Sequence, residues 1–319
     1  MDLDACLVIG ISSRALFDLE EEDRVYQSQG VDGYRKYQRQ HEDAPLKPGT
    51  AFPLIQAFLR LNAFNCDRRL VEVIVMSRNS PDTGLRIFKA IKHHGLDITR
   101  AAFSEGKSVA PYLKPFRVDL FLSKLQNDVQ AAIDSGVAAA QLYTPPADFD
   151  PEKNTIRIAF DADAVVFSED SEFIYKSQGL DAFTKHEEEN ADTPLAEGPF
   201  AKFLKTLALL QHSEDFEIPP VRLAIVTARN SPAHERVIKT LRKWDVYVNE
   251  AFFLGGLPKT EILKAFNAHI FFDDQHTHVD PASAVVPSGR VPYGSESKLH
   301  SKESDRKANS ETVKKTVKK

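Results

Sequence analysis

Four acidic side chains at the ends of apolar stretches are the residues of this sequence best suited to chemistry. Asp161 and Asp163 follow one short apolar run, and Asp273 and Asp274 follow another. Short runs rich in Ile, Val and Phe are typical of buried strands, and open α/β sheets bind their ligands at the carboxyl ends of such strands. Both pairs of acids are therefore predicted to point into a crevice where ligands bind.

Two further polar residues occupy the same kind of position between these pairs. Thr227 follows the apolar run 223–226, and Lys259 lies in the segment Gly-Leu-Pro-Lys-Thr. Each motif alone is weak, because Thr227 could be a plain helix N-cap and Lys259 a surface lysine. A lysine at a helix start opposes the helix dipole, however, which favours a special role. The four motifs in this order are a much stronger signal than any one of them.

The ordered set resembles the haloacid dehalogenase superfamily of phosphotransferases, whose motifs are Asp-x-Asp, Ser/Thr, Lys and an acidic pair. More narrowly, the segments that look like the cytosolic 5'-nucleotidase type I family are residues 12–17, 159–165, 226–229 and 270–275. The resemblance covers most of residues 5–294. It implies an α/β fold of duplicated Rossmann-like parallel sheets, and magnesium-dependent hydrolysis of AMP-like nucleoside 5'-monophosphates.

The resemblance also implies a role for each motif. Asp161 would attack phosphorus and form an aspartyl-phosphate, while Asp163 would protonate the departing 5'-oxygen. Lys259 and Thr227 would bind oxygens of the phosphoryl group. Since a carboxylate repels a phosphate, a cation is needed, and Mg²⁺ prefers oxygen ligands. The implied ligands are Asp161, the main-chain carbonyl of Asp163, and one of Asp273 and Asp274.

Substrate contacts are expected beside these motifs. Arg229 and Asn230 come directly after the threonine and are predicted to contact phosphate or ribose. Specificity is expected from the segment 168–199, which lies where this superfamily inserts a small cap. Aromatic residues there, such as Phe183, either stack on a base or pack the cap helices together.

The sequence repeats itself after about 150 residues, which indicates a duplicated domain. Residues 26–32 return as 175–181, and 51–61 return as 199–210. The motif positions differ between the copies: Ser12, Arg14, Ser77, Val109, Ser123 and Lys124 stand in place of Asp161, Asp163, Thr227, Lys259, Asp273 and Asp274. The first copy is therefore either a purely structural half or one that binds an anion, such as a regulatory nucleotide.

Strands and helices are predicted to alternate along the chain, which is typical of a mostly parallel sheet covered on both faces. The strands expected in the first copy are 6–12, 70–76, 101–103, 118–122 and 138–143, and its helices are 20–41, 51–61 and 82–94. The expected domains are a degenerate half at 1–147 and a catalytic half at 148–294, with the cap inserted at 168–199. Residues 295–319 are polar and end in a basic stretch, so a disordered tail is predicted.

Composition narrows the class of protein. The chain has 319 residues and a net charge of -5, which gives no argument for nucleic-acid binding. Its two cysteines are too few for a disulfide framework or a cysteine-based zinc site. His276 and His278 have a metal-like spacing, but oxygen ligands suit this site, so both are predicted at its rim. Acidic first residues and short apolar runs predict a cytoplasmic protein without membrane spans.

Two alternatives remain open at this point. The first is a phosphatase of the same chemistry that acts on another small phosphomonoester. The second is a non-catalytic regulator that binds a nucleotide in the degenerate half. The acids of the second half argue against it, because a sensor gains nothing from a nucleophile that repels its ligand. Neither the oligomeric state, including a homo-oligomer, nor the direct metal ligand of the late acidic pair follows from the sequence.

Overall fold

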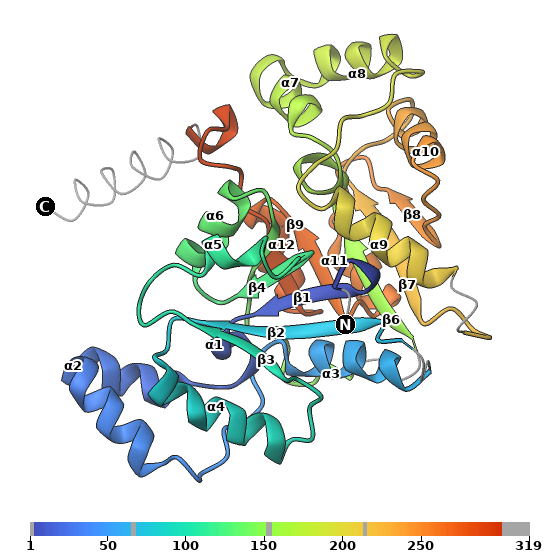
Figure 1. The fold of residues 1–319 in the computed structure, drawn as a ribbon. Coiled ribbons are helices and arrows are strands. Elements are labelled where there is room, and N and C mark those ends of the chain that lie inside the picture. Colours follow the sequence, from blue (N-terminus) through green and yellow to red (C-terminus); the bar gives the residue numbers. More distant parts are fainter. Residues whose placement is uncertain (1–2, 65–67, 151–154, 213–215, 302–319) are drawn as a thin grey trace, which may run out of the picture.

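The centre of the molecule is a single sheet that both halves of the chain share. The computed structural model describes residues 3–64, 68–150, 155–212 and 216–301 (Figure 1). Its ten strands follow the order β3-β2-β1-β4-β5-β10-β9-β6-β7-β8. Neighbouring strands are parallel except β5 and β10, which pair antiparallel at the middle of the sheet. The predicted mostly parallel α/β fold is therefore confirmed.

The elements alternate as expected in both halves. The N-terminal half contains β1 (Leu7–Ile11), α1 (Ser13–Leu16), α2 (Glu20–Gln40), α3 (Phe52–Arg60), β2 (Val71–Ser77), α4 (Pro81–His93), β3 (Arg100–Phe103), α5 (Ala110–Leu113), β4 (Leu120–Ser123), α6 (Gln126–Asp134) and β5 (Ala138–Leu142). The C-terminal half contains β6 (Ile156–Phe160), the irregular turn η3 (Ala162–Val166), α7 (Asp170–Gln178), α8 (Leu180–Glu189), α9 (Ala201–Gln211), β7 (Val221–Thr227), α10 (His234–Lys243), β8 (Glu250–Phe253), α11 (Thr260–Phe266), β9 (Ile270–Asp273), α12 (His276–Ser283) and β10 (Ser288–Arg290). Short 3-10 turns, η1 and η2, span Leu3–Ala5 and Leu61–Phe64. Among the described helices, none combines the length and apolar character needed to cross a membrane.

Alternate residues of the strands enter separate cores, because successive side chains of a strand point to opposite faces. Leu7, Ile9 and Ile11 of β1 belong to one large cluster that also contains residues of β6 and β7. Val8 belongs to a smaller cluster that is confined to the N-terminal half. Both faces of the sheet are thus covered, and on one face the two halves share a continuous core.

The two halves have the same internal strand order. It is β3-β2-β1-β4-β5 in the first and β8-β7-β6-β9-β10 in the second. A separate sheet is predicted for each half, but the edge strands β5 and β10 pair and join the halves into one sheet. This pairing satisfies backbone groups that would be unpaired at the edge of a separate sheet. Since this pair is antiparallel, the carboxyl ends of the strands in the two halves lie at opposite edges of the sheet.

Each half inserts helices after its first strand. In the C-terminal half these are α7 and α8, which meet at Gly179 with a φ of 89°. In the N-terminal half α2 is interrupted in the same way at Gly30, with a φ of 69°. Both glycines adopt the left-handed region that other residues avoid. Figure 1 shows the two insertions at opposite ends of the molecule. Helices α7 and α8 fall within the segment 168–199 in which a cap is expected.

The expected start of the tail at residue 295 is wrong. Residues 298–301 form a helical turn, and Leu299 is 2% exposed beside Tyr293. The backbone N–H of Ser295 donates to Asp134 Oδ1 at 2.8 Å. Burial of an apolar side chain and this hydrogen bond hold the segment, although its composition is polar. Residues 302–319 of the predicted tail lie outside the described residues.

Candidate active site

The predicted site residues lie at the carboxyl edge of the C-terminal half. Asp161 directly follows β6, Thr227 is the last residue of β7, and Asp273 is the last residue of β9. These three strands are neighbours in the sheet. Lys259 occupies the N-cap position of α11. All four side chains are buried, as are Asp163 and Asp274.

Lys259 joins two of the predicted acids. Its Nζ lies 2.8 Å from Asp161 Oδ1 and 2.6 Å from Asp273 Oδ2. Asp273 also accepts a hydrogen bond from the backbone N–H of Gln275 at 2.8 Å, and its Oδ2 lies 3.2 Å from Nδ1 of His278. His278 is partly exposed, as expected for a rim residue, and also contacts a site acid. Motifs far apart in the sequence therefore meet at one lysine.

Three carboxylates form a group suited to a metal ion. Asp161, Asp273 and Asp274 each offer an oxygen within 4.8 Å of the others. Tyr293 donates its hydroxyl to Asp274 Oδ2, whereas Asp274 Oδ1 is buried without a hydrogen-bond partner in the described part of the chain. When all three acids are ionised, the single ammonium of Lys259 leaves two buried negative charges uncompensated, which is costly. A hard divalent cation with oxygen ligands fits this donor set.

The ionisation of the cluster reflects this charge imbalance. Burial raises the pKa of Asp161 to about 7, with Lys259 opposing the shift and Asp273 adding to it. Burial, together with Asp273 and Asp161, raises the pKa of Asp274 well above its ordinary value. Burial also works against the charge of Lys259, but its two carboxylate partners raise its pKa above the ordinary value. Protons on the acids therefore replace part of the missing positive charge when no cation is bound.

Asp163 has a different partner from the other acids. Arg229 donates to both of its carboxylate oxygens, at 2.8 Å from Nε and 2.6 Å from Nη2. Arg229 Nη1 contacts Glu187, and its guanidinium lies 5.2 Å from the ring centre of Phe183. Arg229 is 4% exposed, so in this structure it holds Asp163 and the cap, and does not face open solvent. Asn230 is exposed, and Phe183 packs within the cap.

The backbone around Asp163 is irregular. Asp163 has an extended conformation inside η3, and Ala164 has a φ of 60°. Positive φ is uncommon for alanine, and such strained residues concentrate at functional sites. The corresponding turn of the N-terminal half is the short regular helix α1, without a residue of positive φ. The distortion therefore occurs in the half that carries the acids.

The N-terminal half places other residues at the matching positions of its own sheet edge. Ser12 directly follows β1, and Ser77 and Ser123 are the last residues of β2 and β4. Val109 is the N-cap residue of α5, as Lys259 is of α11. The pairs aligned from the repeat thus occupy equivalent places in equivalent elements, and the acidic cluster has no counterpart among the described residues of this edge.

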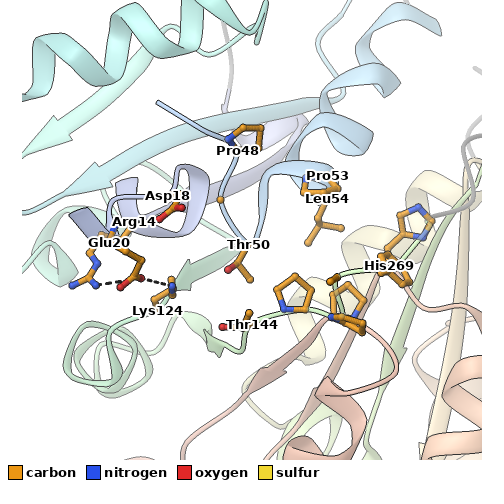
Figure 2. A pocket seen from close by; sticks show the side chains of 16 residues that line it. Arg14, Asp18, Glu20, Pro48, Thr50, Pro53, Leu54, Lys124, Thr144 and His269 are labelled. Carbon is orange, nitrogen blue, oxygen red and sulfur yellow. Dashed lines mark hydrogen bonds and ion pairs between the residues drawn. The ribbon is translucent and has the colours of Figure 1, made fainter. Parts of the chain in front are cut away.

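A cavity of about 810 Å³ borders this edge of the N-terminal half, beside Arg14 and Lys124 (Figure 2). Glu20 lies between them, 3.5 Å from Arg14 Nη2 and 2.7 Å from Lys124 Nζ. Asp18 also lines the cavity. Because the basic side chains of Arg14 and Lys124 are balanced by the acidic side chains of Glu20 and Asp18, the charges that line the cavity do not favour binding of an anion. The regulatory nucleotide therefore stays a prediction, as does the homo-oligomer.

Sequence reasoning missed several residues that contact the site. Glu187 holds Arg229, and Tyr293 donates to Asp274. Lys176 of α7 lies 2.8 Å from the Tyr293 hydroxyl. Glu187 and Lys176 lie inside helices, and Tyr293 lies three residues after β10, so none of them stands at the end of a strand as the predicted acids and Thr227 do.

Comparison with known proteins identifies the family. A family model described as 5'-nucleotidase matches residues 1–298, which include every predicted site residue. Cytosolic 5'-nucleotidase 1B of Homo sapiens is 35% identical over 289 residues, or 88% of this chain and 47% of that protein. The chain thus spans about half the length of this relative. The match confirms the resemblance of the motifs, and the chain belongs to the 5'-nucleotidase family.

Proposed function

We propose that the protein is a magnesium-dependent 5'-nucleotidase that hydrolyses AMP-like nucleoside 5'-monophosphates through an aspartyl-phosphate. The observation that carries the proposal is the meeting of Asp161, Lys259, Asp273 and Asp274 in one buried cluster. Buried acids without enough positive charge destabilise a fold, so a binding role accounts for them better than a structural one. Family membership supplies the substrate class. The relative's name supports a cytoplasmic location.

Two proton transfers accompany the proposed reaction. Asp161 attacks phosphorus, the bond from phosphorus to the 5'-oxygen breaks, and Asp163 gives its proton to that oxygen. The nucleoside leaves as a neutral alcohol. Asp163, now a carboxylate, takes a proton from the water that attacks the aspartyl-phosphate. Phosphate leaves, and the carboxylate of Asp161 is restored.

Positive charge and hydrogen-bond donors receive the phosphoryl group. The ammonium of Lys259, already between Asp161 and Asp273, would also contact a phosphoryl oxygen. The hydroxyl oxygen of Thr227 accepts from the backbone N–H of Arg229 at 3.2 Å, which leaves its proton for the substrate. Mg²⁺ held by the carboxylates and the main-chain carbonyl of Asp163 would offset the repulsion between nucleophile and phosphate.

The two halves have different tasks in this proposal. Residues 148–294 carry the chemistry, and the cap at 168–199 covers the site and selects the substrate, with Asn230 at its open side. Residues 1–147 complete the sheet and its shared core. This division follows from the position of the acids at one edge of the sheet.

Replacement of the proposed nucleophile tests the chemistry. Asp161→Asn should lower phosphate release from AMP with Mg²⁺ by about a thousandfold or more, because the covalent intermediate can no longer form. Ser12→Ala changes the equivalent position of the N-terminal half and should retain activity. Circular dichroism and thermal melting check the fold of both variants. Activity of Asp161→Asn within tenfold of the wild type would rule out Asp161 as the nucleophile.

A panel of phosphate esters tests the substrate class. Nucleoside monophosphates and sugar phosphates are compared by kcat/KM at saturating Mg²⁺. Higher values for nucleoside monophosphates support the proposal. Higher values for sugar phosphates would keep the chemistry and replace the substrate.

A further inference from the structure

A chain of buried charges connects the cap to Asp163. Arg229 binds both carboxylate oxygens of Asp163, and its Nη1 donates to Glu187 Oε2. The other oxygen of Glu187 accepts from Arg236 Nη1 at 3.0 Å and from Ser171 Oγ at 2.8 Å. Glu187 lies on α8, Ser171 on α7 and Arg236 on α10. Glu187, which binds Arg229, is therefore held in place by side chains from α7 and α10.

The network is compensated in charge and closed to solvent. Glu187 is 1% exposed, Arg229 4% and Arg236 8%. Acids and arginines alternate along it, so each charge has an opposite neighbour. Burial works against the charge of Arg229, but Asp163 and Glu187 more than offset this effect and raise its pKa above the ordinary value. Loss of one charged member would leave the buried network with an uncompensated charge, which is strongly unfavourable.

Part of this network has a plain structural purpose that both halves share. Arg236 Nε donates to the carbonyl of Thr193 at 2.8 Å, in the loop after the cap helices. Arg86 occupies the same place in the N-terminal half, where its Nε donates to the carbonyl of Ala44 at 3.2 Å. Arg86 also pairs with Glu22 at 2.7 Å. An arginine and an acid thus hold the inserted helices in each half.

The remaining part differs between the halves. In the N-terminal half, Gln38 Nε2 donates to the Tyr34 hydroxyl at 2.8 Å, and that hydroxyl donates to Asn79 Oδ1 at 3.1 Å. Asn79 corresponds to Arg229, since each backbone N–H donates to the side chain that ends the preceding strand. Hydrogen bonds between uncharged side chains are therefore enough to join α2 to the loop after β2. Arg14, in the place of Asp163, pairs with Asp23 instead.

We propose that Arg229 and Glu187 are positioning residues for Asp163 in the reaction proposed above, on which this inference rests. Glu187 fixes the guanidinium of Arg229, and Arg229 fixes the plane of the Asp163 carboxyl group. Each carboxylate oxygen has a second lone pair, so the contact orients Asp163 without blocking proton transfer. Negative charge develops on Asp163 as its proton passes to the 5'-oxygen, so the bidentate arginine stabilises Asp163 more in the transition state than in the protonated ground state.

The test uses a substrate whose leaving group needs no proton. In the 5'-thio analogue of AMP, sulfur replaces the bridging 5'-oxygen, and a thiolate is a far weaker base than an alkoxide. The measured quantity is kcat/KM, which reports the steps up to departure of the nucleoside. Glu187→Gln should lower kcat/KM for AMP by about ten- to a hundredfold and for the thio analogue by less than about threefold. Arg229→Lys, which keeps the charge but not the two-point contact, should show the same discrimination.

Two references make the outcome decisive. Glu22→Gln breaks the matching arginine–acid pair of the N-terminal half, and should lower stability without discriminating between the substrates. Asp163→Asn should lose about a hundredfold or more on AMP and little on the thio analogue. If Asp163→Asn does not discriminate, the acid role is wrong and the positioning proposal fails with it.

The remaining outcomes judge the positioning proposal alone. One outcome is that Asp163→Asn lowers kcat/KM for AMP much more than for the thio analogue, while Arg229→Lys and Glu187→Gln change both values equally or leave both unchanged. In that case Arg229 and Glu187 are structural, and the proposal is overturned. Should Glu187→Gln fail to fold, Arg229→Lys decides by the same criterion.

Discussion

Replacing Asp274 by Asn should leave the metal-free protein as stable as the wild type but remove its stabilisation by Mg²⁺. The site carboxylates offer oxygens within 4.8 Å of one another, and at an effective permittivity of about 20 two such charges repel by about 3.5 kcal/mol. Burial and this repulsion raise the pKa of Asp274, which favours its neutral form when no cation is bound. Asparagine mimics that neutral form but cannot supply the charge that holds a cation.

The expected size of the effect follows from binding linkage. Mg²⁺ at about a hundred times its Kd adds about 2.7 kcal/mol to the free energy of unfolding. For a chain of this length that corresponds to a rise in Tm of roughly 4 °C. Thermal denaturation followed by circular dichroism, with and without Mg²⁺ at constant ionic strength, measures the rise.

A matched variant controls for the loss of a buried acid. Asp128 is 5% exposed and pairs with Arg78 in the N-terminal half, so Asp128→Asn should keep the full Mg²⁺ response. Asp274→Asn should lose most of it. The reasoning is refuted if the wild type shows no rise in Tm, or if Asp274→Asn shows the same rise as the wild type.

Three further outcomes are expected. Lys259→Ala should lower kcat/KM for AMP by about a hundredfold or more in a phosphate-release assay, because the ammonium that lies 2.8 Å from Asp161 Oδ1 no longer offsets the negative charge of the nucleophile and the phosphoryl group. The apparent Mg²⁺ affinity, measured by calorimetry, should weaken as the pH falls through about 7, because protons compete at Asp161, whose pKa burial raises to about 7. Leu299→Ala should lower the free energy of unfolding in urea by about 2–3 kcal/mol, whereas Leu209→Ala, at a position 75% exposed, should change it by less than about 0.5 kcal/mol.

Local patterns in the chain were enough to predict the fold class and the four motifs. Apolar runs that end in Asp161, Thr227 and Asp273 mark strands whose carboxyl ends carry polar residues. In a parallel sheet such ends share one edge, so their meeting follows from chain direction alone. The repeat likewise paired Ser12 with Asp161, because matching elements recur at a nearly constant spacing. The family match confirms the resemblance that these motifs indicated.

Other features depend on which surfaces meet in three dimensions, and no periodicity encodes that. The pairing of β5 with β10 merges the halves into one sheet, and it involves two edge strands far apart in the chain. Arg229 was expected at the substrate, yet it binds Asp163, since its direction depends on Glu187 of the cap. Leu299 lies in a polar segment but is buried beside Tyr293. The ends of strands can be predicted from local patterns in the sequence. The partner of a buried charge or apolar side chain cannot, because it depends on packing between elements that are far apart in the chain.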